Sequence, residues 1–324
     1  MNETDVEALE RALELAERGR ATTHPNPVVG AVLMSADGEV VGEGWHERKG
    51  EPHAEVNALG AAGERARAST AYVTLEPCAH QGTTPPCVDA LVKAGVARVV
   101  AGQLDPNPGI VGGGLEKLRA AGVEVELAAG ELAFRCRRQI QAWRTWVGLG
   151  RPFVTYKVAV SLDGRVTVPG SRWVSGEESR RYVHELRAAS DAVAVGMGTV
   201  RADHPRLDVR DVPTLRGQPR RLAFGRGPLP EGSELELRSG SLRDEFEALA
   251  TEGVQSLLLE GGPTLATAFL EQDLVDELLV LVAPRLSGDG PRMLGALPRP
   301  VELRRLEAAG VGDDVLLRAY VHEP

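Results

Sequence analysis

Two stretches of sequence, Glu51-Pro-His-Ala-Glu-Val-Asn57 and Thr74-Leu-Glu-Pro-Cys-Ala-His-Gln-Gly-Thr-Thr-Pro-Pro-Cys87, decide how the first half of the chain folds. The first provides an imidazole, His53, and two residues later a carboxylate, Glu55. The second provides two thiols, Cys78 and Cys87. One nitrogen and two sulfurs leave one position of a tetrahedral zinc open for water, which is the arrangement of a catalytic site rather than a structural one.

His-x-Glu followed by Pro-Cys and a second Cys is also the signature of zinc deaminases, in which the glutamate carries protons and does not bind metal. The alternative, a structural zinc site, would need a fourth protein ligand. His80 lies only two residues after Cys78, and so short a link arranges neighbouring ligands poorly. The pattern therefore predicts a catalytic zinc bound by His53, Cys78 and Cys87, with Glu55 as the proton carrier.

The composition bounds the class of protein. The chain has 324 residues, of which 43% are hydrophobic and 26% charged, as in a globular protein of two domains. Its net charge of −9 repels phosphate backbones, so we expect no nucleic-acid partner, although local Arg and Lys residues can bind a small anion. We find no apolar run as long as the ~18 residues of a membrane span and no apolar leader, and we expect a cytoplasmic enzyme without membrane contact. Three cysteines, two of them assigned to the metal, do not suggest a disulfide framework, and Cys136 is interpreted as a packing residue.

Strands and helices alternate in the first half, which predicts an α/β domain with a mixed sheet flanked by helices. Thr4 and Glu7 have the spacing of a capping box at the start of the first helix. Strands are predicted over 28–34, 39–45, 71–75, 96–102 and 123–127. Helices are predicted over 4–20, from 52 onward, over 86–94 and over 114–121.

Gly148-Leu-Gly-Arg-Pro152 is the best domain boundary, because two glycines and a proline interrupt a helix before a new strand. We therefore expect a first domain over 1–147 and a second over 148–324. Strands are predicted in the second domain over 153–160, 192–196, 219–224, 256–260, 278–283 and 316–321, and helices over 177–189, 241–252 and 263–271. Gly196-Met-Gly198 and Gly261-Gly-Pro263 each end a strand at a corner whose backbone N–H groups can hold a phosphate.

Asn26 lies between Pro25 and Pro27, and the residue before a proline favours extended backbone. Such a segment can present the Asn26 amide stiffly to a heterocycle or a ribose, since the amide is both donor and acceptor. A rigid turn leading into the strand over 28–34 explains the prolines equally well.

Taken together, these motifs resemble the bifunctional riboflavin-biosynthesis deaminase-reductase family, over almost the whole chain. In the first half the resemblance rests on the two stretches quoted above and on His24-Pro-Asn-Pro27 and Asp105-Pro-Asn-Pro108. In the second half it rests on Lys157, Ser161-Leu-Asp-Gly164, Gly198-Thr-Val200 and Glu260-Gly-Gly-Pro-Thr-Leu265.

The resemblance implies a cytidine-deaminase-like domain followed by a dihydrofolate-reductase-like α/β domain. The first would hydrolyse the 2-amino group of 2,5-diamino-6-ribosylamino-4(3H)-pyrimidinone 5′-phosphate with Zn²⁺. The second would reduce the ribosyl side chain to ribityl with NADPH. The partner would thus be a small phosphorylated pyrimidine, and we expect a homo-oligomer, a dimer or larger.

The resemblance also implies roles for individual residues beyond the zinc site. The deaminase substrate would contact Asn26, His46 and His80. The reductase substrate would contact Lys157, Ser171, Arg187, Leu207, Arg210 and Glu260, and Arg187 and Arg210 would supply positive charge for its 5′-phosphate. NADPH would contact Ala159, Trp173, Thr199, Asp203, Gly262, Pro263, Thr264, Leu265, Ala266, Thr267 and Ala268.

The sequence departs from the family pattern at three places. Thr83 stands where a Lys or Arg is usual, and His204 interrupts an Asp-Asp-Pro run. Leu222-Ala-Phe-Gly-Arg226 replaces a strand end that commonly carries Asp and a small hydroxyl residue, so Arg226 could pair with the 2′-phosphate of NADPH instead. These changes define the alternative, a deaminase whose second domain has lost hydride transfer. With two separate sites, we expect the intermediate to be released into solvent.

Overall fold

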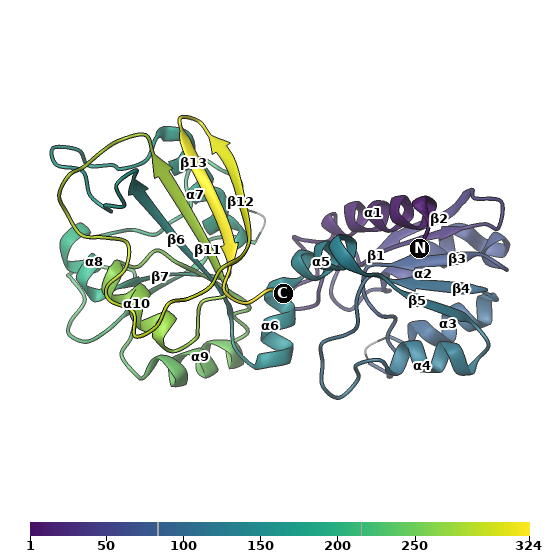
Figure 1. Ribbon diagram of the computed structural model, residues 1–324. Coiled ribbons are helices and arrows are strands. Elements are labelled where there is room, and N and C mark those ends of the chain that lie inside the picture. Colours follow the sequence, from purple (N-terminus) through teal and green to yellow (C-terminus); the bar gives the residue numbers. More distant parts are fainter. Residues whose placement is uncertain (83, 215) are drawn as a thin grey trace. The chain divides into compact units, whose positions relative to one another are not determined.

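The structure is a computed structural model that describes residues 1–82, 84–214 and 216–324 (Figure 1). It contains two units, Met1–Leu149 together with Pro324, and Gly150–Glu323. Each unit has its own sheet and its own hydrophobic core.

The first unit is built on a five-stranded sheet of order β2-β1-β3-β4-β5. Its strands are β1 (Gly30–Met34), β2 (Val40–Trp45), β3 (Thr70–Val73), β4 (Arg98–Ala101) and β5 (Glu124–Leu127). β1 is antiparallel to β2 and to β3, whereas β3, β4 and β5 are mutually parallel. The sheet is therefore mixed, as the sequence predicted.

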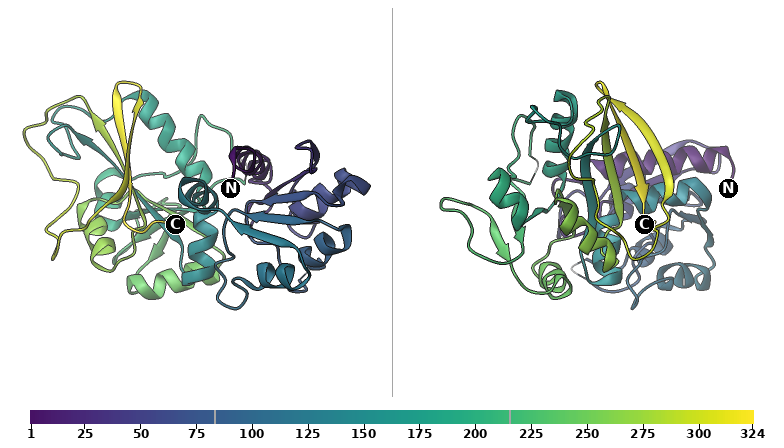
Figure 2. Two further views of the ribbon diagram at one scale, coloured as in Figure 1. Left: turned by 45° about the vertical axis from the view of Figure 1, so that its right-hand side comes forward. Right: turned by 60° about the vertical axis from the view of Figure 1, so that its left-hand side comes forward.

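Helices cover both faces of this sheet (Figure 2). They are α1 (Glu3–Glu17), α2 (Ala54–Ala62), α3 (Cys87–Ala94), α4 (Gly113–Ala120) and α5 (Gly130–Gln139). A 3₁₀ turn, η1 (Gly63–Ala66), follows α2, and a further helix, α6 (Gln141–Leu149), follows α5. Alternate residues of a strand point to opposite faces, so Val32 and Met34 pack with α1 and α5, while Ala31 and Leu33 pack with α2, α3 and α4.

The helix α2 carries His53 at its start. Its backbone packs directly against the backbone of β2. A Cβ atom on Gly42 or Gly44 would overlap the backbone of Ala54, Ala58 or Ala62. Glycine on the strand and alanine on the helix therefore allow the close approach, and no large side chain fills the interface.

The predicted capping box of the first helix is wrong. The helix begins at Glu3, and its N-cap is Asn2, whose side chain accepts a hydrogen bond from the backbone of Asp5 while Asp5 accepts one from Asn2. Asp5 is 2% exposed, and its carboxylate also binds Arg98 and Tyr72. These tertiary contacts select the register that the Thr4–Glu7 spacing alone does not reveal.

The second unit is built on an eight-stranded sheet of order β12-β13-β11-β6-β10-β7-β8-β9. Its strands are β6 (Phe153–Ser161), β7 (Ala192–Gly196), β8 (Arg220–Phe224), β9 (Glu236–Arg238), β10 (Ser256–Leu259), β11 (Glu277–Ala283), β12 (Arg304–Val311) and β13 (Asp314–Tyr320). Neighbours from β11 to β9 are parallel, and β13 is antiparallel to β11 and β12. β9 and β12 form the two edges, and the sequence analysis did not predict either of them.

Four helices accompany this sheet in the described part of the unit: α7 (Glu177–Ala189), α8 (Met197–Asp203), α9 (Leu242–Thr251) and α10 (Pro263–Glu271). Phe224, Phe246 and Phe269 pack together in the core, with ring centroids 5.3–6.5 Å apart. β7 and β10 are parallel neighbours, so the glycine corners at their ends meet, and Leu265 packs against both Gly196 and Gly261.

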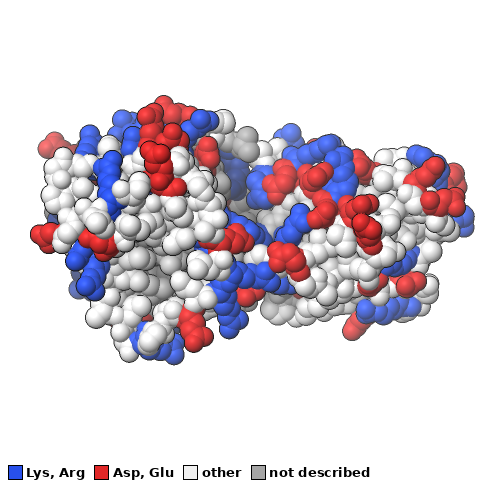
Figure 3. Space-filling model, turned by 45° about the horizontal axis from the view of Figure 1, so that its top comes forward, with Lys and Arg blue, Asp and Glu red and all other residues white. Residues whose placement is uncertain are grey.

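In the described residues, none of the helices is long and apolar enough to cross a membrane. On the face drawn in Figure 3, basic and acidic side chains are interspersed on both units.

Candidate active sites

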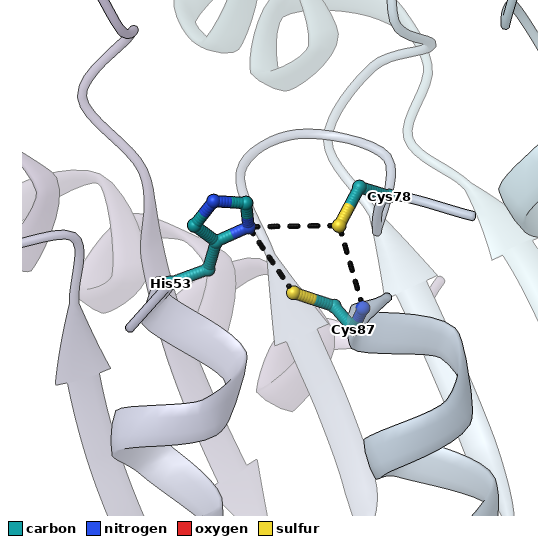
Figure 4. A group of neighbouring side chains, drawn as sticks. All are labelled: His53, Cys78 and Cys87. Atoms are coloured by element: carbon teal, nitrogen blue, oxygen red, sulfur yellow. Dashed lines mark hydrogen bonds between the residues drawn. The ribbon is translucent and has the colours of Figure 1, made fainter. Parts of the chain in front are cut away.

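The predicted zinc ligands lie together in the first unit (Figure 4). His53 is the N-cap residue of α2, Cys87 is the first residue of α3, and Cys78 lies in the loop after β3. His53 Nδ1 is 3.5 Å from Cys78 Sγ and 3.3 Å from Cys87 Sγ, and the three ligand atoms lie within 4.8 Å of one another. One nitrogen and two sulfurs so close together fit the donor set of zinc.

The two thiols of the cluster differ in acidity. Hydrogen bonding from Cys87, together with that from His53, lowers the pKa of Cys78 to about 4. The pKa of Cys87 is raised, because its thiol is the donor to Cys78 and is also buried. The backbone N–H of Cys87, at the start of α3, donates to Cys78 Sγ at 3.3 Å. The cluster thus already favours one thiolate, the form that binds metal.

Glu55 lies in the first turn of α2, beside the ligands, and is 3% exposed. Burial raises the pKa of its carboxyl to about 7. A carboxyl group near neutrality can both accept and return a proton at physiological pH.

Asn26 and His46 are joined by a hydrogen bond at the edge of the same site. Asn26 Nδ2 is 3.2 Å from His46 Nε2, and His46 Nδ1 is 3.2 Å from the Pro52 oxygen. Burial lowers the pKa of His46, so the ring is neutral at pH 7. In that state Nδ1–H donates to Pro52 and Nε2 accepts from Asn26, which leaves the Asn26 Oδ1 acceptor available.

These residues line a pocket of about 270 Å³. It brings together the predicted residues Asn26, His46, His53, Glu55, Cys78 and His80. The sequence analysis assigned no role to other lining residues, among them Glu76, Asp105, Asn107, Ile110 and Trp143. The Asp105-Pro-Asn-Pro108 motif was the available signal for two of them. Thr83 lies outside the described residues.

The second unit has a larger cavity, of about 1100 Å³, on which the helix α7 and the glycine corners converge. Arg187 of α7 binds Glu260 with two hydrogen bonds, of 2.6 and 3.1 Å, and Lys157 Nζ of β6 lies 3.6 Å from Glu260 Oε2. Burial alone would raise the pKa of Glu260, but the charges of Lys157 and Arg187 outweigh it, and the pKa is lowered. Glu260 is therefore ionised and held in one orientation.

Most of the residues predicted for the reductase line this cavity: Lys157, Ala159, Trp173, Arg187, Thr199, Asp203, Arg210, Glu260, Gly262, Pro263, Thr264 and Leu265. The lining does not include five others: Ser171, Leu207, Ala266, Thr267 and Ala268. Trp173 is 50% exposed, with the guanidinium carbons of Arg172 and Arg180 5.0 and 5.5 Å from its ring centroid. These two arginines, and His184, were not predicted from the sequence.

The two departures from the family pattern in the second unit, His204 and the Leu222–Arg226 stretch, lie at the end of α8 and at the end of β8. His204 is the C-cap of α8 in the left-handed conformation, with φ of 45°. Leu222 and Phe224 are buried in β8, and Gly225 follows with φ of 134°, packed on Met197. The backbone oxygen of Arg226 accepts a 2.7 Å hydrogen bond from Arg201, so two guanidinium-bearing residues meet at this corner.

Comparisons with known families define the class of each half. Residues 2–103 match the cytidine and deoxycytidylate deaminase zinc-binding region, and residues 152–317 match the RibD C-terminal domain. The protein is thus an enzyme that combines a zinc-dependent deaminase with a reductase.

Relatives identify the family. The chain is 38% identical to the riboflavin biosynthesis protein RibD of Aquifex aeolicus (98% of each chain covered) and 40% identical to that of Escherichia coli (95% of this chain and 96% of the other). The solved structure of Acinetobacter baumannii RibD is 36% identical with a TM-score of 0.86, covering 98% of each chain. A Thermotoga maritima deaminase/reductase structure is 31% identical with a TM-score of 0.82, again covering 98% of each chain. The chain belongs to the RibD family of bifunctional riboflavin-biosynthesis enzymes, and the prediction from sequence is confirmed.

Proposed function

We propose that the His53 pocket deaminates 2,5-diamino-6-ribosylamino-4(3H)-pyrimidinone 5′-phosphate and that the Glu260 cavity then reduces the ribosyl group to ribityl with NADPH. One observation carries the first assignment: the ligand atoms of His53, Cys78 and Cys87 lie within 4.8 Å of one another, with buried Glu55 in the adjoining turn. Zinc and NADPH are the cofactors of this two-step chemistry.

His53, Cys78 and Cys87 would hold the zinc. When bound, zinc lowers the pKa of water towards ~7 and so supplies hydroxide as a nucleophile at neutral pH. Glu55 would move the protons of the hydrolysis: it would take one from the attacking water and deliver protons to the ring nitrogen and to the departing amine, so that water and an amidine carbon become a carbonyl and ammonia.

Asn26, His46 and His80 bind the pyrimidine. The hydrogen bond from Asn26 Nδ2 to His46 fixes the amide, so Asn26 Oδ1 accepts from an N–H group of the ring. His80 is exposed at the rim of the pocket, where the sugar phosphate of the substrate would extend.

In the reductase, Arg187 orients Glu260, because its guanidinium already binds both Glu260 oxygens and the backbone oxygen of Asp208. Arg210, whose side chain is 47% exposed and lies 3.3 Å from Asp208 Oδ1, supplies positive charge for the 5′-phosphate together with Arg187. Lys157, Ser171, Leu207 and Glu260 complete the substrate side. Ala159, Trp173, Thr199, Asp203 and residues 262–268 hold NADPH, with its phosphates near the N-terminus of α10.

We assign the deaminase to residues 1–147 and the reductase to 148–324. The net charge of −9 makes the protein a poor match for a nucleic-acid backbone. We propose a cytoplasmic homo-oligomer whose partner is the small phosphorylated pyrimidine.

The test is to supply the diaminopyrimidinone ribosylamino phosphate with and without NADPH and to follow the mass of the product. We expect exchange of an amino group for oxygen without NADPH and the further gain of two hydrogens with it. A product that stops at the deaminated stage with NADPH present would support the deaminase-only alternative instead.

A further inference from the structure

The Glu76 side chain, in the loop that carries Cys78, accepts hydrogen bonds from four backbone N–H groups of residues 105–115. It lies two residues before Cys78, is 5% exposed, and lines the deaminase pocket. Its Oε1 accepts hydrogen bonds from the N–H groups of Gly114 (2.8 Å) and Leu115 (3.3 Å). Its Oε2 accepts from Asp105 (3.0 Å) and Gly112 (2.9 Å).

The segment that Glu76 binds, residues 103–112, contributes to the wall of the pocket, and we call it the Asp105 loop. Asp105, Asn107 and Ile110 of this loop line the pocket. The loop contains no helix or strand. Glu76 accepts hydrogen bonds from the backbone N–H groups of Asp105, near the start of the loop, and of Gly112, at its end. The backbone N–H of Glu76 also donates to the Gln103 oxygen at 2.9 Å.

The contact between Glu76 and the start of α4 requires glycine at position 114. A Cβ atom at that position would overlap the Pro77 oxygen and lie 3.1 Å from Glu76 Oε1. The start of α4 can therefore approach the zinc loop closely enough for a buried carboxylate to accept its N–H groups, which the helix dipole favours.

We infer that Glu76 is a positioning residue of the deaminase: it holds the Asp105 loop at a fixed distance from the zinc loop and so sets the width of the substrate pocket. Both oxygens of Glu76 are occupied by backbone donors, so it acts through the loop and not on the reacting atoms. This inference rests on the proposed function, because it assigns the pocket to the pyrimidine substrate.

The test is Glu76→Gln in the full-length enzyme, with Glu116→Gln, an exposed glutamate on α4, as the matched control. In glutamine, one carboxylate oxygen is replaced by an NH₂ group. This group faces backbone N–H donors and cannot accept their hydrogen bonds, so part of the contact with the Asp105 loop is lost. We expect KM for the deaminase substrate to rise about tenfold or more while kcat changes little, since a lost charge-assisted hydrogen bond is worth about one factor of ten. Zinc content should stay at the wild-type value, and amide hydrogen exchange should speed up in peptides covering residues 103–116.

Three results would overturn the inference: unchanged KM despite faster exchange in the Asp105 loop, loss of zinc together with kcat at constant KM, or equal effects in Glu116→Gln. Glu76→Asp, which keeps the charge but shortens the side chain, should raise KM in the same direction and serves if Glu76→Gln does not fold. Zinc content reports on whether the first unit is folded, and reductase turnover on the deaminated intermediate with NADPH reports on the second unit in the same preparation. If the wild-type enzyme releases no ammonia at all, it is the proposed function that fails.

Discussion

Asp5 and Arg98 form a bidentate ion pair that joins the first helix, α1, to the start of strand β4. Arg98 Nη1 and Nη2 donate to the two oxygens of Asp5 at 2.7 and 3.1 Å, and the Tyr72 hydroxyl donates to Asp5 Oδ1 at 2.8 Å. The side chain of Asp5 is 2% exposed and that of Arg98 19%. Since Asp5 also completes the N-cap of α1, one carboxylate serves the helix start and the sheet together.

Asp5→Asn should destabilise the first unit by about 2 kcal/mol, because it removes the buried carboxylate of the pair and leaves the half-buried Arg98 only its more exposed partners Glu124 and Glu126. Urea unfolding followed by circular dichroism measures the loss. Glu7→Gln, at an exposed position of the same helix, is the control and should change stability by less than about 0.5 kcal/mol. A comparable loss in both variants would mean that helix charge, and not the ion pair, matters.

The same pair makes the stability of the unit depend on pH. Hydrogen bonds from Arg98 hold the pKa of Asp5 well below its usual range. A carboxyl whose folded pKa is depressed stabilises the fold above its unfolded pKa of about 3.9, and this contribution is lost as the pH falls towards the folded value. The difference in unfolding free energy between wild type and Asp5→Asn should therefore shrink between pH 6 and pH 3. A difference that stays constant over this range would contradict the assignment.

Glu55→Gln should retain zinc but lower the rate of ammonia release by at least about a hundredfold, because the amide cannot carry the proton. Metal analysis and an ammonia assay on the same preparation separate the two effects. Reductase turnover on the deaminated intermediate should be unchanged. Near-normal ammonia release would overturn the role given to Glu55.

Removal of the metal with a chelator should abolish deamination and leave the reduction of the deaminated intermediate intact. The reason is that His53, Cys78 and Cys87 all belong to the first unit, whereas the Glu260 cavity belongs to the second. Added Zn²⁺ should restore ammonia release. Parallel loss of both activities would show that the metal supports the whole chain.

Arg187→Lys should lower reductase kcat/KM by about tenfold or more, because a lysine cannot bind both oxygens of Glu260 in the same plane. Ammonia release is the control and should not change. Arg243→Lys, at an exposed position of α9 outside the lining of the cavity, should behave as wild type. Equal activity of Arg187→Lys and wild type would show that the orientation of Glu260 does not limit the reduction.

The sequence was sufficient to predict the zinc ligands because they lie in short motifs, and two of the three are at helix starts. His53 and Cys87 each open a helix, and the Pro residues before them mark those starts. The mixed sheet of the first unit was equally predictable, since its buried strands carry regular apolar patterns.

Contacts between distant parts of the chain were not predictable in the same way. Glu260 and Arg187 are 73 residues apart, and their pairing follows from the order of strands in the sheet. In the sequence, Glu76 is only one more residue of the zinc motif. Its hydrogen bonds to the Asp105 loop are visible only in the folded structure. β12 escaped prediction because an edge strand that is largely exposed, as this one is, needs no apolar alternation.

The close approach of α2 to β2 through Gly42 and Gly44 has a consequence for how the enzyme can vary. Because main chain rests on main chain there, the location of His53 is insensitive to which side chains fill the rest of the core. A single added methyl group at Gly44, in contrast, would be passed on as a rigid shift of the helix and hence of the imidazole. Substitutions remote from the pocket should therefore fall into two groups. Most should leave the position of His53 unchanged, whereas at a few glycines one added carbon atom should displace His53 and weaken metal binding.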